Sequence, residues 1–371
     1  MKKGLILLIV LGIMVSSVIT AAAPPAIESE LVLITPVTKF IVDGAAEKFK
    51  AYARKTYGIN VTVNASYSGT PVCFGKITEW AGRPQADIFW GGESALFDKL
   101  AQEKLLVKLD ISDEIIGAIP NSIGQPKPVP LKDPNKFWVG TTLEPYGVSY
   151  NPKLLKRLGV ASIKTWDDLL NPKLKGWVAQ CTPDRSSSNH ASYEVIFQAM
   201  GLEKGWVWAE KLAANTPHFA ARSRDVPSLV AKGEAAVGFA VPSYMQFEEV
   251  LAGYDVRFVA PENCFVTCEP IAVLAGAKNA RAAQAFIEFL HTEEGQRVFM
   301  ERGLFPITPK YRVAGAAGST AEKAVEFTGV RSFFDAPVKN IYDDEIAQKR
   351  YNEVNETFRK RILEQHDKLK K

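Results

Sequence analysis

Two hydrophobic patterns alternate along the chain from about residue 30 onward. Short apolar runs rich in β-branched residues, the first of them ELVLIT at 30–35, are typical of strands. Between them lie longer stretches in which apolar residues recur every three or four positions, and the first of these, 41–58, ends at a glycine. This repeated strand and helix order predicts an α/β fold in which mainly parallel sheets are flanked by helices.

The same pattern divides the chain into two units. The first continues through predicted strands at 59–67 and 86–91 to a proline-rich loop, and a second α/β unit starts near Thr141. A later run, 269–303, supplies another strand and two helices. A chain of this length is long for a single hydrophobic core, so we expect two lobes.

The first 23 residues have a different pattern. Lys2 and Lys3 precede an uninterrupted apolar run, and small residues in an A-x-A arrangement follow it and end at Ala23. This predicts an export signal that is cleaved before Pro24. Because the apolar run approaches membrane-spanning length, a retained membrane anchor is the alternative.

Composition and net charge indicate which classes of binding partner the protein is suited to. Hydrophobic residues make up 47% of the 371 residues, which is enough for a sizeable core. The formal net charge is +4, and removal of the two lysines of the signal leaves about +2. This balance favours neither nucleic acid nor an acidic surface as the partner.

Short polar loops stand where predicted strands run into helices. They are Thr35, the SGT run 68–70, the GGES run 91–94 and, in the second unit, the RSSSN run 185–189. Ligands gather at the carboxyl ends of parallel strands, where free amides and helix dipoles favour anions or polar oxygens. Ser and Thr are also ordinary helix caps, so one loop alone is weak evidence. Four such loops in two units together predict a ligand cradle.

Two other kinds of site fit these loops less well. None of the serines at 186–188 has the flanking glycines of a G-x-S-x-G nucleophile, and His190 stands too close along a helix to face Ser188. The run GTPVCFGKI at 69–77 has five residues between its glycines and ends in Ile77, where a phosphate-binding loop needs Ser or Thr. A secreted α/β hydrolase is therefore kept only as an alternative function.

Several runs taken together resemble an extracellular solute-binding protein of an ABC importer. They are SYSGT at 66–70, ADIFWGGESALFDKLAQEKLL at 86–106, YGVSYNPKLLKRLG at 146–159, TWDDLLNPKLKG at 165–176, KGEAAVGFAVPS at 232–243 and the long run that begins EPIAVLAG at 269. The similarity is greatest to the group of ferric-iron, phosphonate and sugar-phosphate binders, and it covers nearly the whole chain after the signal. The order of the motifs is more specific than any single motif.

The resemblance implies a two-lobed, type II-like periplasmic-binding-protein fold with the ligand in the cleft between the lobes. The expected division is a signal peptide at 1–23, lobe 1 at 24–140, lobe 2 at 141–268, a return to lobe 1 at 269–325 and a C-terminal helical segment at 326–371. We expect a monomeric, non-enzymatic receptor without a cofactor, in the periplasm or on the extracellular side of the membrane. It would close on a small molecule and deliver it to a membrane permease.

The donors available to that ligand favour an anion. Hydroxyls, glycine amides and Arg222, which offers a two-pronged contact, suit a phosphoryl, phosphonyl or carboxyl group. The predicted ligand-binding residues are Thr35, Ser68, Gly69, Thr70, Glu93, Ser94, Thr142, Ser186, Ser187, Ser188, Asn189, Arg222, Ser243 and Tyr244. Among them, Glu93 either binds hydroxyls or an amine of the ligand or only complements a helix dipole. Glu144 and Tyr146 are expected to border the cleft, and no residue is predicted to be catalytic or to bind a metal.

A ferric-iron site is the alternative within the resemblance. Ferric members of the group present adjacent tyrosines after the GEAAVGF-type strand, whereas here the run is VPSYMQF, with Tyr244 alone. The His and Glu that often help to hold iron have no match, because Thr38 and Gly92 fall at those places. One tyrosine with one nearby acid, Glu93, is a poor ligand set for a hard, highly charged cation.

The four cysteines leave the disulfide pattern open. Cys73, Cys181, Cys264 and Cys268 allow three complete pairings, and their spacing does not resemble paired CxxC zinc motifs. Cys264 and Cys268 flank FVT in an expected loop, and an oxidising compartment would let them join if their side chains converge. That pairing is one hypothesis, beside free or differently paired thiols.

Overall fold

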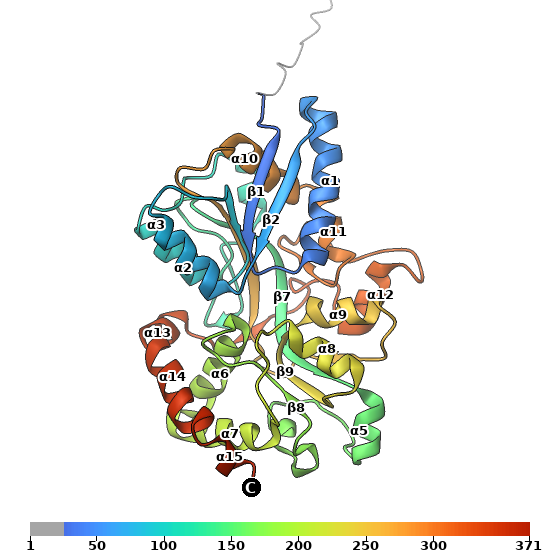
Figure 1. Ribbon diagram of the computed structural model, residues 1–371. Coiled ribbons are helices and arrows are strands. Elements are labelled where there is room, and N and C mark those ends of the chain that lie inside the picture. Colours follow the sequence, from blue (N-terminus) through green and yellow to red (C-terminus); the bar gives the residue numbers. More distant parts are fainter. Residues whose placement is uncertain (1–25) are drawn as a thin grey trace, which may run out of the picture.

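The computed structural model describes residues 26–371, which form two α/β lobes stacked one above the other (Figure 1). The expected signal peptide, 1–23, lies outside the described residues. Within 26–371, no helix combines the length and the apolar sequence needed to cross a membrane.

One sheet runs through both lobes in the order β2-β1-β3-β11-β7-β9-β8. In lobe 1, β1 (Glu30–Thr35) lies parallel to β2 (Thr62–Tyr67) and to β3 (Ile88–Trp90). In lobe 2, β8 (Val178–Ala179) lies parallel to β9 (Val237–Pro242). Both lobes therefore contain the parallel pairs that the repeated strand and helix order predicts.

Two strands cross between the lobes and run antiparallel to their neighbours. β7 (Val139–Tyr150) pairs with β11 (Val266–Val273) along its first half and with β9 along its second half. Two short strands, β12 (Phe305–Pro306) and β10 (Arg257–Val259), also pair with β7. The predicted two-lobed α/β fold is confirmed, and its sheet is mixed because the crossover strands reverse direction.

A glycine permits the tight pairing of β7 in lobe 2. Gly147 lies where β7 passes between β9 and β10, and a Cβ atom there would stand 2.3 Å from the backbone carbonyl oxygen of Val259. Any other residue would force β10 away from β7.

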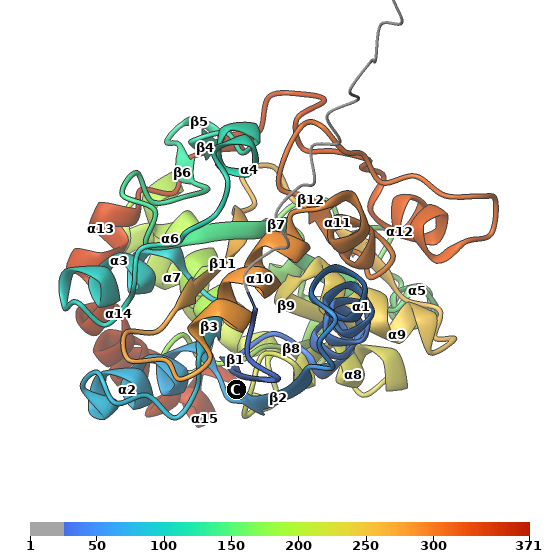
Figure 2. The same cartoon turned by 90° about the horizontal axis from the view of Figure 1, so that it is seen from above.

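Helices cover both faces of the lobe 1 sheet (Figures 1 and 2). On one side lie α1 (Lys39–Tyr57), α10 (Ala280–Leu290) and α11 (Glu293–Met300), which pack against one another. On the other side lie α2 (Thr70–Trp80) and α3 (Ser94–Gln102).

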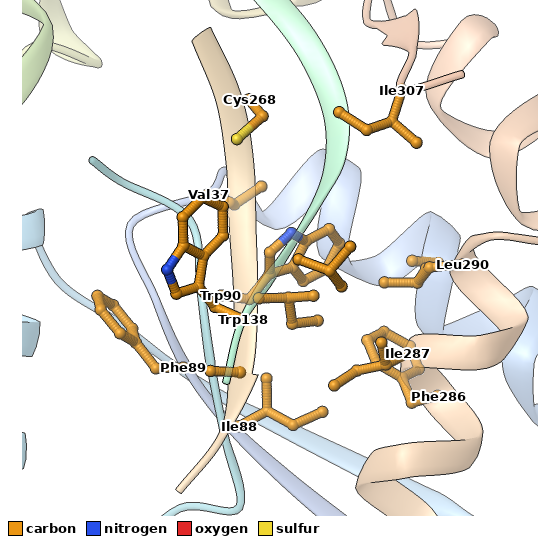
Figure 3. Close-up of a cluster of buried hydrophobic side chains, with 14 of the residues drawn as sticks. Val37, Ile88, Phe89, Trp90, Trp138, Cys268, Phe286, Ile287, Leu290 and Ile307 are labelled. Carbon is orange, nitrogen blue, oxygen red and sulfur yellow. The ribbon is translucent and has the colours of Figure 1, made fainter. Parts of the chain in front are cut away.

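The lobe 1 core forms where α10 meets the sheet (Figure 3). Phe286, Ile287 and Leu290 of α10 point toward the β3 region, where Ile88 and Trp90 are fully buried. In lobe 2, helices α5 (Pro152–Leu158), α6 (Ser187–Met200) and α7 (Leu202–Asn215) contribute to a second core. Two further helices of lobe 2, α8 (Asp225–Lys232) and α9 (Ser243–Leu251), contribute to smaller apolar clusters. Lobe 1 also contains α4 (Asp113–Ala118) and the short strands β4 (Ser122–Ile123), β5 (Gln125–Pro126) and β6 (Val129–Pro130).

The C-terminal segment contacts both lobes. α12 (Thr320–Thr328) packs against α9 and β10 of lobe 2, and β13 (Lys339–Asn340) then pairs with β5 of lobe 1. The last elements lie against lobe 2; they are α13 (Asp344–Lys349), α14 (Tyr351–Phe358), a π-helical turn at Arg359–Leu363 and α15 (His366–Leu369). Val354, Phe358 and Ile362 from this segment are buried in the lobe 2 core. The residue limits expected for the lobes stay a prediction.

All four cysteines are free thiols, so the structure contradicts the Cys264–Cys268 pairing. The two side chains belong to different cores: Cys264 packs in the lobe 2 core and Cys268 in the lobe 1 core. The reason is that β11 already begins at Val266, so Cys268 lies in an extended crossover strand and not in the expected loop. Its Sγ atom stands 3.6 Å from the carbonyl oxygen of Pro130.

The burial of the thiols predicts their reactivity. Because burial raises the pKa of both Cys73 and Cys264 to about 12, the reactive thiolate is scarce at neutral pH. We expect a thiol-labelling disulfide reagent to modify the folded protein slowly and to titrate four thiols once the protein is unfolded without reductant. Fewer than four thiols in the unfolded protein would show a disulfide and contradict the structure.

Candidate functional site

A cavity of about 50 Å³ lies between the two lobes, with room for about four water molecules at roughly 12 Å³ each. Lobe 1 supplies Pro36, Gly69, Thr70 and Gly92, and the crossover strands supply Glu144, Tyr146 and Glu269. Lobe 2 supplies Arg185, Ser186, Ser187, Ser188, Arg222, Ser223, Arg224, Pro242, Tyr244 and Met245. The cavity is thus built at the ends of strands in both lobes, where the polar loops were predicted to meet.

Two helix N-termini face each other across this cavity. Thr70, the first residue of α2, has its hydroxyl 3.4 Å from that of Ser187, the first residue of α6. Gly69 has no side chain to cap α2, Pro71 has no N–H, and the amides of Val72 and Cys73 donate to the carbonyl oxygen of Gly69 (both 3.0 Å). The amide of Thr70 is therefore the one at this helix start that a ligand could use. At α6 the Ser186 hydroxyl accepts a hydrogen bond from the Asn189 amide (3.2 Å) and lies 3.1 Å from the Ser188 hydroxyl.

Three arginines bring positive charge to the rim. Arg222 is held by Asp225 (Nη2 to Oδ1 2.8 Å) and its side chain is 64% exposed. Arg224 donates from Nη2 to the carbonyl oxygen of Pro36 (2.9 Å), which joins lobe 2 directly to lobe 1. Within the described part of the chain, neither Arg185 nor Arg224 forms an ion pair, so two guanidinium charges beside the cavity have no carboxylate partner.

The floor of the cavity is acidic. Glu144 on β7 and Glu269 on β11 are 1% and 5% exposed. Glu269 Oε2 accepts a hydrogen bond from the amide of Gly92 (2.9 Å), whereas Glu144 Oε2 has no hydrogen-bond partner among residues 26–371. Burial, and then the charge of Glu269, raises the pKa of Glu144 well above its usual range. Burial raises the pKa of Glu269 as well. Both shifts favour the protonated carboxyl, so the pair keeps a proton to a higher pH than a free carboxyl does.

The two glycines of the GGES run make this floor possible. Gly91 and Gly92 have φ angles of 97° and 110°, which glycine adopts without strain. A Cβ on Gly91 would stand 2.7 Å from Glu269 Oε2, and a Cβ on Gly92 would stand 2.3 Å from Cγ2 of Thr70. The close approach of the α2 N-terminus to the carboxyl pair therefore depends on both glycines.

Half of the predicted site residues line the cavity, namely Gly69, Thr70, Ser186, Ser187, Ser188, Arg222 and Tyr244. The remainder, Thr35, Ser68, Glu93, Ser94, Thr142, Asn189 and Ser243, lie outside its lining. Three of these hydroxyls are used within the fold: Thr35 donates to Trp90 O (2.7 Å), Thr142 to Phe305 O (2.7 Å) and Ser243 to Gly303 O (3.4 Å). Whether any predicted residue binds a ligand stays a prediction.

Several residues of the cavity lining carry little or no signal in the sequence. Arg185, Arg224 and Glu269 line the cavity but were not predicted. Glu269 had one usable signal, because a charged residue at the head of an apolar strand demands a partner or a function. The arginines stand in polar loops, where a charge carries no such signal.

A serine hydrolase arrangement is not formed among the described residues. Both ring nitrogens of His190 lack hydrogen-bond partners, and the Ser188 hydroxyl lies beside Ser186 instead. Burial, and to a smaller extent the charge of Arg350, lowers the pKa of His190 to about 3. Its ring instead packs on Tyr351 of α14, with the ring centroids 4.3 Å apart.

Two lobes joined by crossover strands around a polar cavity define a periplasmic binding protein. A family model described as bacterial extracellular solute-binding protein matches residues 31–305. The chain belongs to this family, whose members are the solute-binding proteins of ABC import systems.

Relatives and solved structures differ in what their names say they bind. A putative 2-aminoethylphosphonate-binding periplasmic protein of Salmonella typhimurium is 24% identical over 275 residues, 70% of this chain and 75% of the relative. The periplasmic binding protein AfuA of Actinobacillus pleuropneumoniae, solved with fructose 6-phosphate, has a TM-score of 0.72 at 21% identity and covers 90% of this chain and 98% of its own. Iron-bound HitA of Pseudomonas aeruginosa has a TM-score of 0.65 at 21% identity, covering 88% and 99%. At these identities the structures show the fold alone.

Glu93, next to the cavity, predicts a pH dependence of stability. Its carboxyl is buried, and burial first, then the charges of Asp344 and Glu194, raises its pKa to about 8 from 4.5. The folded protein therefore holds a proton that the unfolded chain releases. The contribution of Glu93 to the free energy of unfolding is complete below about pH 4.5 and is lost as the pH rises toward 8.

Replacing Glu93→Gln should remove this contribution. The free energy of unfolding of the variant minus that of the parent should increase by roughly 3 kcal/mol between pH 5 and pH 8, at about 1.4 kcal/mol per pKa unit. Urea unfolding of the ligand-free protein at both pH values measures this. Glu103→Gln, an exposed change at the end of α3, is the control. Identical pH slopes in the parent and Glu93→Gln would contradict the assignment.

Proposed function

We propose that this protein is exported, captures a small anion with a phosphoryl, phosphonyl or carboxyl group in the interlobe cavity, and delivers it to the permease of an ABC importer. One observation carries the proposal. The N-termini of α2 and α6 face each other beside two guanidinium groups that have no ion-pair partner in the described chain. Amides at helix N-termini and two neighbouring arginines are the donors that suit a doubly charged anion.

Lobe closure is the proposed mechanism of capture. Among residues 26–371, only two polar contacts that line the cavity join the lobes directly, the long Thr70 to Ser187 hydroxyl contact and the Arg224 to Pro36 hydrogen bond. An anion that bonds to both helix N-termini adds contacts that exist only in the closed state. Closure therefore follows from the ligand's preference for that state.

The names of relatives support an anion of this kind. The Salmonella relative is named for a phosphonate, and the AfuA structure was solved with a sugar phosphate. Both ligands carry the tetrahedral oxyanion that the serine and amide donors of the cavity would hold.

Ferric iron is the second candidate, because one observation favours it. Tyr146 and Tyr244 line the same cavity as Glu144 and Glu269, which gives four oxygen donors instead of the single tyrosine and single acid expected from the sequence. Against iron, burial and the nearby glutamates raise the pKa of both phenols well above the usual range, and the arginines on the rim repel a cation.

A ligand screen tests the proposal. We expect a rise in melting temperature with at least one of fructose 6-phosphate, 2-aminoethylphosphonate, 3-phosphoglycerate and inorganic phosphate, and none with ferric citrate beyond that with citrate alone. A visible tyrosinate-to-iron absorption band on addition of ferric citrate would favour the second candidate. Turnover of a phosphate ester by the purified protein would contradict a purely binding role.

The serines at the start of α6 provide the matching mutational test. Replacing Ser187 and Ser188 together with Ala should raise the dissociation constant of the best-bound probe roughly tenfold or more, at about 1 kcal/mol per lost hydrogen bond. Isothermal titration calorimetry measures it. Ser192→Ala, a buried serine on the same helix outside the cavity lining, is the control and should leave the affinity unchanged. Equal affinities of all three proteins would remove the serines from the site.

A further inference from the structure

The cavity has two chemically different ends. Hydroxyls, amides and the unpaired guanidinium groups of Arg185 and Arg224 make one end suited to an anion. At the other end stand Glu144 and Glu269, which no anion would approach favourably. A purely anionic ligand would leave this second end unused.

The acidic end has no cationic partner among residues 26–371. Glu144 is 1% exposed and lines the cavity, yet its Oε2 atom has no hydrogen-bond partner among the described residues. Glu269 is bonded through Oε2 to the amide of Gly92. No lysine or arginine of residues 26–371 forms an ion pair with either carboxyl. A buried carboxyl pair without a cation beside it costs stability, so its presence at a ligand cavity points to a cationic or donor group on the ligand.

The side chain of Thr70 lies between the two ends of the cavity. The hydroxyl of Thr70 is 3.4 Å from that of Ser187 at the anion end. The methyl group of the same threonine abuts Gly92, whose amide bonds Glu269 at the acidic end. A molecule that touches both ends therefore needs only a short spacer between its two charges.

We propose that Glu144 and Glu269 form a subsite for a primary ammonium group, so that the ligand is a small zwitterion with a phosphonyl or phosphoryl group a few bonds from its amine. This inference rests on the proposed anion-binding function and narrows its ligand class. The carboxyl pair rejects simple anions of the same shape because they leave it without a partner.

Binding of such a ligand displaces a proton. Burial favours the protonated form of both carboxyls, and the charge of Glu269 adds to this effect at Glu144. The proposal therefore requires the pair to hold a proton in the ligand-free protein. An ammonium group between the two carboxyls supplies the compensating charge, so the pair ionises fully and the proton passes to the buffer. The other ionisable groups that face the pair are Tyr146 of β7, Tyr244 of α9 and Arg224 at the start of α8, and Glu93 adds to the negative charge around Tyr146.

Calorimetry with matched probes tests the subsite. 2-Aminoethylphosphonate carries an ammonium group where n-propylphosphonate carries a methyl group of similar size, and O-phosphoethanolamine distinguishes a phosphate ester from a phosphonate. We expect at least one of the two amines to bind tenfold or more tightly than n-propylphosphonate at pH 7. Repeating the titrations in buffers of different ionisation enthalpy should show release of about one proton per amine bound and none for n-propylphosphonate.

Two variants and a control locate the effect. Glu144→Gln and Glu269→Gln should each reduce the preference for the amine about tenfold and reduce the proton release, while thermal melts check that the variants fold. Glu288→Gln, which removes a half-buried acid of α10 far from the cavity lining, should behave as the parent.

The outcomes separate the subsite from the function on which it rests. Equal affinity for the amines and n-propylphosphonate, absence of proton release, or an unchanged preference in both variants overturns the subsite alone. Tight binding of fructose 6-phosphate with no binding of either amine also overturns it and leaves anion binding intact. If none of these probes and no inorganic phosphate binds, the proposed function fails together with the subsite.

Discussion

The pairing of β7 with β11 is the constraint on which the rest of the molecule depends. Both strands cross from one lobe to the other, and their register sets Pro145 opposite Val266 and Glu144 opposite Thr267 in the middle of the crossing. A strand cannot stop at the boundary without leaving backbone amides and carbonyls unpaired. The strands therefore continue through the crossing, where alternate side chains point to the cavity, and Glu144, Tyr146 and Glu269 line it.

The C-terminal segment adds a third connection between the lobes. β13 pairs with β5 of lobe 1, and Asp343 just after it is bound to Lys127 of lobe 1 (2.7 Å) and to Gln198 of lobe 2 (2.6 Å). Arg350 then donates from Nε to the fully buried Glu194 of α6 (2.9 Å). α6 carries the serines of the cavity, so any movement between the lobes must bend this segment as well as the two crossover strands. The direct contacts across the cavity are fewer and weaker than these connections.

The sequence predicted the architecture well and the site only in part. Strand and helix order depends on local patterns that each segment carries by itself. Residues from three of the four polar loops line one cavity, and their role in binding stays a prediction. Glu269 and Arg224 were missed because their proximity to the cavity depends on the crossover register and on lobe closure, which no local pattern encodes. The hydroxyls of Thr35, at the end of β1, and Thr142, within β7, already donate to distant carbonyl oxygens, which no local pattern shows. The Cys264–Cys268 pairing was wrong because the chain passes from the lobe 2 core at Cys264 to the lobe 1 core at Cys268.

Specificity on this scaffold follows from which charges stand at the two ends of one small cavity. The fold is shared with structures that hold a sugar phosphate or iron, so the fold itself does not select the ligand. Here the anion end is built from backbone amides and hydroxyls that any such fold offers at its helix starts. The acidic end requires two glutamates buried together, and such a pair would be replaced at no loss by apolar residues if it served packing alone. Keeping it costs stability in the ligand-free protein, and under the proposed subsite a cationic group of the ligand offsets that cost. In that proposal the pair is the part of the site that distinguishes among anions, while the helix starts and arginines bind the anionic group.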